Sequence, residues 1–285
     1  MQRHTLERCL AALLAVACAR APVAASEREP SGAAATGASA EERVLVNTSD
    51  STPTESMALA RSRAAVVELF TSEGCSSCPP ADENLAAIAE DGERSGQRIF
   101  ALEFHVDYWN DLGWVDPFSS PAYSERQRRY ARELGLTGIY TPQMVVNGRE
   151  ELLGSRRVAA QAAIRRALST PATVAVTVRA RRSESAPTSI QVDYRVSAKG
   201  VVDLNLALAL DRAETQVTRG ENANRKLLHR HVVRAFETRR VENTGSGTWL
   251  APWPASARGV AGFVVAYVSQ GAAVGADSAS IPALK

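Results

Sequence analysis

Apolar and polar positions change their pattern near residue 64 of this chain. Residues 26–63 are rich in Ala, Ser, Thr, Gly and Glu and show little periodicity, which predicts a flexible tether. From residue 64 onward, short apolar runs alternate with amphipathic stretches, which predicts strands and helices in turn. The expected elements are a strand over 64–70, a helix over 79–91, a strand over 98–106, a helix over 121–134, strands over 143–146 and 151–153, and a helix over 156–168.

Residues typical of helix starts and turns support these boundaries. Pro79 and Pro80 suit the first turn of a helix, where the N–H group that proline lacks has no partner in any case. Ser120 is a good helix cap, because its hydroxyl can accept a hydrogen bond from the first turn. Asn147 and Gly148 together predict a tight hairpin between two short strands.

Beyond residue 171 the pattern becomes a simple alternation. Strands are expected over 173–179, 190–196, 202–210, 227–236 and 262–268. Strands that follow one another without helices imply antiparallel pairing, in a sandwich or a small barrel. The sequence therefore predicts two domains, an α/β domain at 64–170 and a mostly antiparallel, β-sandwich-like domain at 171–285.

Residues 1–25 have the pattern of an export signal peptide. Arg3 and Arg8 form a basic start, the apolar run 9–19 follows, and small residues precede the expected cleavage site. The apolar run is too short to span a bilayer, so we expect no transmembrane helix once the signal is removed. The alternative is lipoprotein processing, which would leave Cys18 as a lipid anchor. Either route predicts an exported protein of the periplasm or cell envelope.

The charge of the chain argues against a nucleic-acid partner. The formal net charge is +2, from 33 Lys and Arg and 31 Asp and Glu. Residues 1–25 contain three arginines and one glutamate, so the remainder carries 30 basic and 30 acidic side chains. Proteins that bind nucleic acids usually have an excess of basic side chains that contact the phosphates, and this sequence has no such excess.

Removal of the signal leaves Cys75 and Cys78 as the remaining cysteines. A disulfide between them closes a loop too small to stabilise the chain much, so in an oxidising compartment the pair is more useful as a redox couple. The pair lies between a strand and a helix, where free N–H groups favour a thiolate. We expect Cys75 to be the nucleophile and Cys78 the resolving thiol. The alternatives are a structural disulfide or half of a zinc site.

Several segments together resemble a known family. The resemblance is carried by VELFTS (67–72), GCSSCPPAD (74–82), FHVDYW (104–109), LGW (112–114) and YTPQ (140–143), and more loosely by 219–222 and 229–234. These segments are similar to the exported thioredoxin-like family filed as domain of unknown function 1223. The resemblance implies a thioredoxin-like fold with an appended β domain, and it implies no known substrate.

The same resemblance gives Thr141 and Pro142 a role. In the thioredoxin and glutaredoxin superfamily a cis-proline begins the strand that faces the CxxC loop, and the residue before it offers backbone hydrogen bonds to the substrate. The resemblance therefore implies that the Thr141–Pro142 bond is cis and that both residues position a partner. The alternative is an ordinary trans proline that enters a strand.

The segment 105–117 is dense in Trp, Tyr and Asp and supplies candidate auxiliary residues. His105 ends the second expected strand, and it could act as a proton shuttle, a soft-metal ligand or a hydrogen-bonded structural residue. Trp109 could line a groove for an extended polypeptide or cover the core. Asp107 lies between them and is a further auxiliary candidate.

Three polar residues on other expected strands have two interpretations each. Glu68, on the strand before the CxxC loop, is either a buried base for Cys78 or an exposed carboxylate. His229 and His231 alternate on one strand and project to the same side, where they could bind a metal. We expect these two histidines to be solvated.

The predicted function is that of an enzyme, an exported thiol-disulfide oxidoreductase that acts on protein or small-thiol disulfides without an organic cofactor. The first alternative is a copper-binding or copper-delivery module that uses Cys75, Cys78 and His105, because thiolates and imidazole suit Cu(I). The second alternative is a non-catalytic interaction protein built on the same fold, which a buried Cys75 would favour.

Overall fold

The computed structural model describes residues 63–257, 259–270 and 273–283. The expected signal peptide, the Cys18 anchor site and all of the expected tether except Arg63 lie outside the described residues.

Strands and helices over 65–169 follow the predicted order. They are β1 (Ala65–Thr71), α2 (Pro79–Ser95), β2 (Ile99–His105), the short 3-10 helix η1 (Asn110–Leu112), α3 (Pro121–Glu133), β3 (Gln143–Val146), β4 (Glu150–Leu153) and α4 (Arg157–Ser169). Their strands lie in the spatial order β4-β3-β1-β2, with β1 parallel to β2 and antiparallel to β3. In the described part of the chain, none of the helices has the length and apolar character that a bilayer crossing requires.

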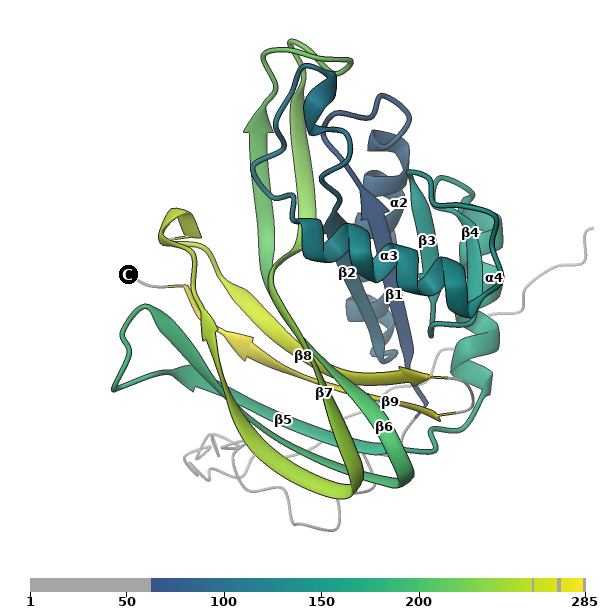
Figure 1. The fold of residues 1–285 in the computed structure, drawn as a ribbon, viewed down its shortest axis with the longest axis vertical. Coiled ribbons are helices and arrows are strands. Elements are labelled where there is room, and N and C mark those ends of the chain that lie inside the picture. Colours follow the sequence, from purple (N-terminus) through teal and green to yellow (C-terminus); the bar gives the residue numbers. More distant parts are fainter. Residues whose placement is uncertain (1–62, 258, 271–272, 284–285) are drawn as a thin grey trace, which may run out of the picture. The chain divides into compact units, whose positions relative to one another are not determined.

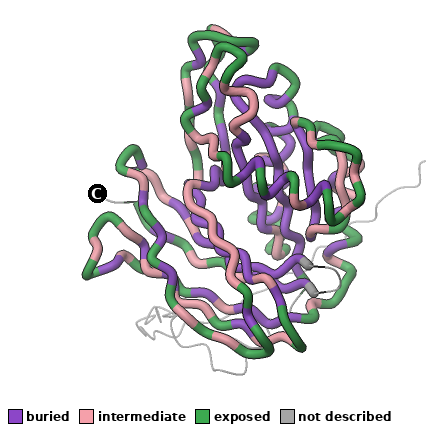
Figure 2. The backbone as a smooth tube through the Cα atoms, viewed as in Figure 1, coloured by how far each residue is buried: buried purple, intermediate pink, exposed green. Residues whose placement is uncertain are grey.

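Strand β1 is covered on both faces, and all seven of its residues are buried (Figure 2). Val67 and Leu69 point to one face and pack with the apolar residues of α2 and α4. Val66 and Phe70 point to the other face and pack with Tyr130 of α3. In Figure 1, α3 lies in front of the strands and α2 behind them. The continuous apolar run of β1 reflects this double burial.

The remaining strands pair with one another in antiparallel orientation. They are β5 (Ala175–Arg182), β6 (Ser189–Gln216), β7 (Lys226–Pro252), β8 (Gly262–Gln270) and β9 (Ala273–Ile281), with the 3-10 helix η2 (Ala255–Ala257) between β7 and β8. All belong to one nine-stranded sheet with β1–β4, rather than to two facing sheets. The sheet curls, and the N–H groups of Thr173 and Val174 reach Val274 O at the start of β9. The fold is thus a mixed α/β fold with mostly antiparallel strands.

Several strands of this β-rich part differ from expectation, among them β7, which runs beyond the expected 227–236 to Pro252. The strands expected over 190–196 and 202–210 are one strand, β6, because pairing with β7 continues through a register shift between Ser197 and Val201. Strand β9 was not expected, since its sequence AVGADSASI consists mostly of small residues with weak β-propensity. Its strand form follows from pairing with β8 along its whole length.

One sheet and one core run across the expected boundary at residue 170. Strand β2 pairs with β7 in parallel at Glu103 and Val232. A core cluster joins Phe104 and Tyr123 to Val233 and Tyr267. The described residues form one compact unit. The expected boundary therefore coincides with a change in secondary structure and not with a break in the sheet.

A buried ion pair lies within this shared core. Arg126 of α3 donates from Nε and Nη2 to Glu68 of β1 at 2.5 and 2.9 Å. Tyr130 donates to the same carboxylate at 2.5 Å, and Arg126 also reaches the hydroxyl of Tyr267 at 3.0 Å. Glu68 is 1% exposed, so the exposed alternative is wrong. Its two carboxylate oxygens are occupied by these donors, and it does not stand free as a base.

We expect Arg126→Met to lower the free energy of unfolding by about 3–5 kcal/mol, because it leaves the Glu68 carboxylate buried without its partner. Denaturant unfolding measures the change. The double variant Glu68→Met/Arg126→Met should recover most of the loss. Arg128→Met, on the exposed side of the same helix, is the matched control and should change stability by no more than about 0.5 kcal/mol. If Arg126→Met and Arg128→Met lowered the free energy of unfolding equally, the result would contradict the role of the ion pair.

Candidate functional site

Cys75 and Cys78 form a disulfide at the turn between β1 and α2, with their Cα atoms 5.5 Å apart. Cys78 is the N-cap of α2 and lies just outside the helix, before Pro79. Its backbone nevertheless has helical angles, φ −77° and ψ −41°, which a residue before proline usually avoids. The pair thus lies at the amino end of a 17-residue helix.

The hairpin tip that joins β6 to β7 covers the cysteine pair. Asn222 Nδ2 donates to the carbonyl oxygens of Glu73 and Cys75 at 2.9 and 3.0 Å. Glu221 Oε2 accepts from the N–H of Ser76 at 2.9 Å. Cys75 and Cys78 are both 0% exposed, which is the arrangement that a non-catalytic interaction protein predicts. In the sequence, residues 219–222 lie between the strands expected over 202–210 and 227–236, and their only signal is a loose family resemblance.

Trp109 connects the CxxC loop to Thr141. A Cβ atom at position 74 would lie 3.1 Å from Trp109 Cβ, so the close approach of this tryptophan requires Gly74. The indole N–H of Trp109 donates to Thr141 Oγ1 at 2.8 Å. Trp109 is half-buried and packs between these two segments.

The Thr141–Pro142 peptide bond is cis, as predicted. Pro142 O accepts from the N–H of Gly154 at 2.9 Å. A Cβ atom at position 154 would lie 3.0 Å from Ala81 Cβ and 3.5 Å from Pro142 Cβ, which places Pro142 next to the first turn of α2. The family resemblance also implies that Pro142 contacts the cysteine sulfurs, and this contact stays a prediction.

His105 is fully buried at the end of β2. Its Nδ1 lies 2.7 Å from Asp116 Oδ2, and the same carboxylate oxygen accepts from the N–H of Glu73 at 2.8 Å. Asp107, the other auxiliary candidate of this segment, exchanges hydrogen bonds with Ser124 of α3. Asp107 therefore holds the start of α3, whereas His105 belongs to a buried cluster of charged groups.

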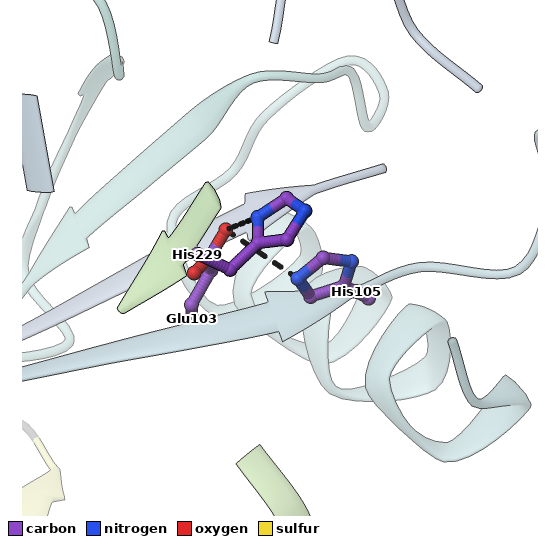
Figure 3. Close-up of side chains that lie close together, drawn as sticks. All are labelled: Glu103, His105 and His229. Atoms are coloured by element: carbon purple, nitrogen blue, oxygen red, sulfur yellow. Dashed lines mark hydrogen bonds and ion pairs between the residues drawn. The ribbon is translucent and has the colours of Figure 1, made fainter. Parts of the chain in front are cut away.

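His229 of β7 is the second imidazole of this cluster. Its Nδ1 lies 2.8 Å from Glu103 Oε1 and its Nε2 lies 3.2 Å from Glu73 Oε1. The rings of His105 and His229 meet edge to face, with centroids 4.7 Å apart. Figure 3 shows both imidazoles directed toward the Glu103 carboxylate. His229 is 1% exposed and His231 is 9% exposed, and His231 Nδ1 donates to Ala101 O at 3.0 Å, so the expectation of two solvated histidines is wrong.

The carboxylates decide the charge of both imidazoles. Burial alone would lower the pKa of His105, but the Asp116 and Glu103 carboxylates raise it to about 9. For His229, Glu103 and Glu73 likewise outweigh burial and raise the pKa well above its usual value. Burial alone would raise the pKa of Glu103, and the two imidazoles instead lower it to about 2. The cluster therefore favours charged imidazoles and charged carboxylates at neutral pH.

Asp82 is a titratable residue of this region that the sequence analysis missed. It lies in the first turn of α2, four residues after Cys78, and Thr71 Oγ1 donates to it at 2.7 Å. Burial, and to a lesser extent the nearby Glu103 charge, raise the pKa of Asp82 to about 7. The sequence signal that could have identified Asp82 is its spacing from Cys78, because residues four apart are neighbours on a helix.

Comparison with known proteins supports the family resemblance. Residues 66–268 match the family described as "Protein of unknown function (DUF1223)". The chain belongs to this family. No curated protein matches the chain.

Two solved structures are similar to this DUF1223 protein. One is the crystal structure of protein AGR_C_4864 from Agrobacterium tumefaciens, with 29% identity and a TM-score of 0.57, over 78% of this chain and 95% of the other. The other is HBP35 of Porphyromonas gingivalis, with 16% identity and a TM-score of 0.55, over 79% of this chain and 78% of the other. The second likeness concerns the fold alone.

We expect Asp82→Asn to remove a pH dependence of stability. Because the folded pKa of Asp82 is above its unfolded value, its contribution is present below about pH 4 and lost as the pH rises through about 7. The variant carries a neutral side chain throughout, so its stability relative to the unmodified protein should rise between pH 5 and pH 8 by a few kcal/mol, on the order set by the linkage relation. Denaturant unfolding at several pH values measures the difference. Glu83→Gln, an exposed neighbour, is the control, and a pH-independent difference for Asp82→Asn would contradict the assignment.

Proposed function

We propose that this DUF1223 protein is an exported thiol-disulfide oxidoreductase with a thioredoxin-like fold over residues 64–170. The observation that carries the proposal is a disulfide at the amino end of α2 together with a cis-proline beside the first turn of that helix. Export follows from the pattern of residues 1–25, and the substrate is a protein or small-thiol disulfide. The reaction needs no organic cofactor.

The proposed reaction moves two electrons between the cysteine pair and the substrate. In the reducing direction, the Cys75 thiolate attacks one sulfur of the substrate disulfide, forms a mixed disulfide and releases one substrate thiolate. The Cys78 thiolate then attacks Cys75 Sγ, which releases the second substrate thiolate and restores the Cys75–Cys78 disulfide. The reverse sequence oxidises a substrate dithiol.

Asp82 suits the proton transfer that this sequence requires. Cys78 must lose its proton before it can resolve the mixed disulfide. A carboxyl group with a pKa of about 7, in the first turn of the same helix, is able to accept that proton near neutral pH. Glu68, for which a base role was one of two interpretations from sequence, accepts hydrogen bonds from Arg126 instead.

The covering hairpin sets a condition on this function. Both cysteines are buried, so a substrate disulfide reaches Cys75 only when residues 221–222 release the CxxC loop. If the hairpin never opens, the second candidate function applies, in which the fold is a non-catalytic scaffold. Accessibility of Cys75 in the reduced protein therefore distinguishes the two candidates.

We expect Cys78→Ser to capture substrates as stable mixed disulfides, because no thiol remains to release them from Cys75. Non-reducing electrophoresis of envelope extracts that contain the variant reads out these adducts. Cys75→Ser is the matched control and should capture few or none. Absence of adducts with Cys78→Ser, or equal capture by both variants, would contradict the proposed roles.

We expect Asn222→Ala to speed alkylation of Cys75 in the reduced protein by about tenfold or more, because it removes two hydrogen bonds, each worth about 1 kcal/mol net, that hold the hairpin on the CxxC loop. Mass spectrometry of the time course measures the rate. Arg219→Ala, an exposed residue of the same hairpin, is the control and should leave the rate unchanged. Slow alkylation in all three proteins would favour the scaffold function.

A further inference from the structure

Three buried side chains from two strands lie close enough together to be ligands of one metal ion. Glu103 and His105 of β2 and His229 of β7 each offer one ligand atom, and these atoms all lie within 4.8 Å of one another. All three residues are at most 1% exposed. Glu103 and His105 are two residues apart on a strand and so share a face, which the close-up in Figure 3 displays.

One of these ligand atoms lacks a hydrogen bond. His105 Nε2 is buried and finds no hydrogen-bond partner among the described residues. It points toward the cluster and lies 3.4 Å from Glu103 Oε1. A buried ring nitrogen without a partner is costly, and a bound ion would satisfy it.

The neighbouring groups orient the ligands as the outer partners of a metal site do. Asp116 holds His105 through Nδ1 at 2.7 Å and leaves Nε2 free. Glu73 lies 3.2 Å from His229 Nε2 and leaves Nδ1 for the ion. The N–H of Arg230 donates to Glu103 Oε2 at 3.1 Å, so Oε1 faces the imidazoles. Carboxylates behind histidine ligands are the common outer shell of zinc sites.

We propose that Glu103, His105 and His229 form a binding site for a divalent transition-metal ion of the zinc class. Two imidazole nitrogens and one carboxylate oxygen are a ligand set that such an ion accepts, with a fourth position left open. Ligands on one tetrahedral zinc ion lie about 3.3 Å apart. Glu103 Oε1 and His105 Nε2 are already at 3.4 Å, whereas Glu103 Oε1 and His229 Nδ1, at 2.8 Å, must separate by about half an ångström.

The charge of the region accommodates a dication. Three buried carboxylates, those of Glu73, Glu103 and Asp116, surround the two imidazoles. A divalent ion displaces one proton from each charged imidazole when it binds, so its two positive charges replace theirs opposite the carboxylates. The site shares His105 with the copper alternative but uses neither cysteine, so it does not rest on the proposed redox chemistry.

The test uses the full chain with its disulfide intact, produced with Zn²⁺ and purified without chelators. Elemental analysis should find about one zinc per chain. After chelator treatment, calorimetric titration with Zn²⁺ alone should give a dissociation constant below about 1 µM. His105→Gln and His229→Gln should each weaken binding at least 100-fold, and Asp116→Asn about 10–100-fold.

Two control variants locate the site. His231→Gln, on the same strand as His229, and the double variant Cys75→Ser/Cys78→Ser should both retain one zinc with unchanged affinity. Loss of zinc in the cysteine variant alone would place the metal at the thiols and overturn the proposal. Lack of stoichiometric zinc binding by the unmodified chain would also overturn it.

A spectroscopic measurement on the unmodified chain does not depend on the folding of any variant. Loaded with Co²⁺, the protein should give the visible bands of nitrogen and oxygen ligation, without the near-ultraviolet charge-transfer band of thiolate ligation. Zn²⁺ should also raise the melting temperature of the chelator-treated protein. A thiolate band, or an unchanged melting temperature, would count against the site.

Discussion

Charged side chains are buried where the α/β part of the chain meets the β-rich part, and each has a partner from another element. Glu68 of β1 pairs with Arg126 of α3, next to Tyr267 of β8. Glu103 of β2 pairs with His229 of β7. An unpaired buried charge destabilises a protein by several kcal/mol, so β1 and β2 tolerate their carboxylates only with these partners in place. The two parts of the chain therefore depend on each other for charge as well as for apolar contact.

The length of β6 and β7 has a functional consequence. At 28 and 27 residues they are far longer than ordinary strands, and they extend from the β-rich core to the loop that carries the cysteines. Their hairpin supplies Asn222 and Glu221 to the CxxC loop. The β-rich part thus acts directly at the candidate redox site, and any motion of the hairpin changes access to Cys75.

Glu73 links the cysteine loop to the buried cluster. Its N–H donates to Asp116 and its carbonyl oxygen accepts from Asn222. Its carboxylate lies near His229 and accepts from the indole of Trp114 at 2.7 Å. Glu73, two residues before Cys75 in the chain, is therefore in direct contact with both the covering hairpin and the imidazole of His229. The Cys75–Cys78 disulfide therefore lies near the proposed metal ligands, but the two sites share no atoms.

The sequence by itself determined the local features: the order of strands and helices over 65–169 and the Cys75–Cys78 pair between β1 and α2. These features depend on short-range patterns such as apolar periodicity, proline position and motif spacing. The cis bond before Pro142 was implied by the family resemblance. Only the tertiary structure decided that β9 exists, that Glu68 meets Arg126, and that His229 lies beside Glu103. Each of these depends on contact between segments far apart in the chain. Neither the small residues of β9 nor the residues next to His229 in the chain indicate which distant segment packs against them.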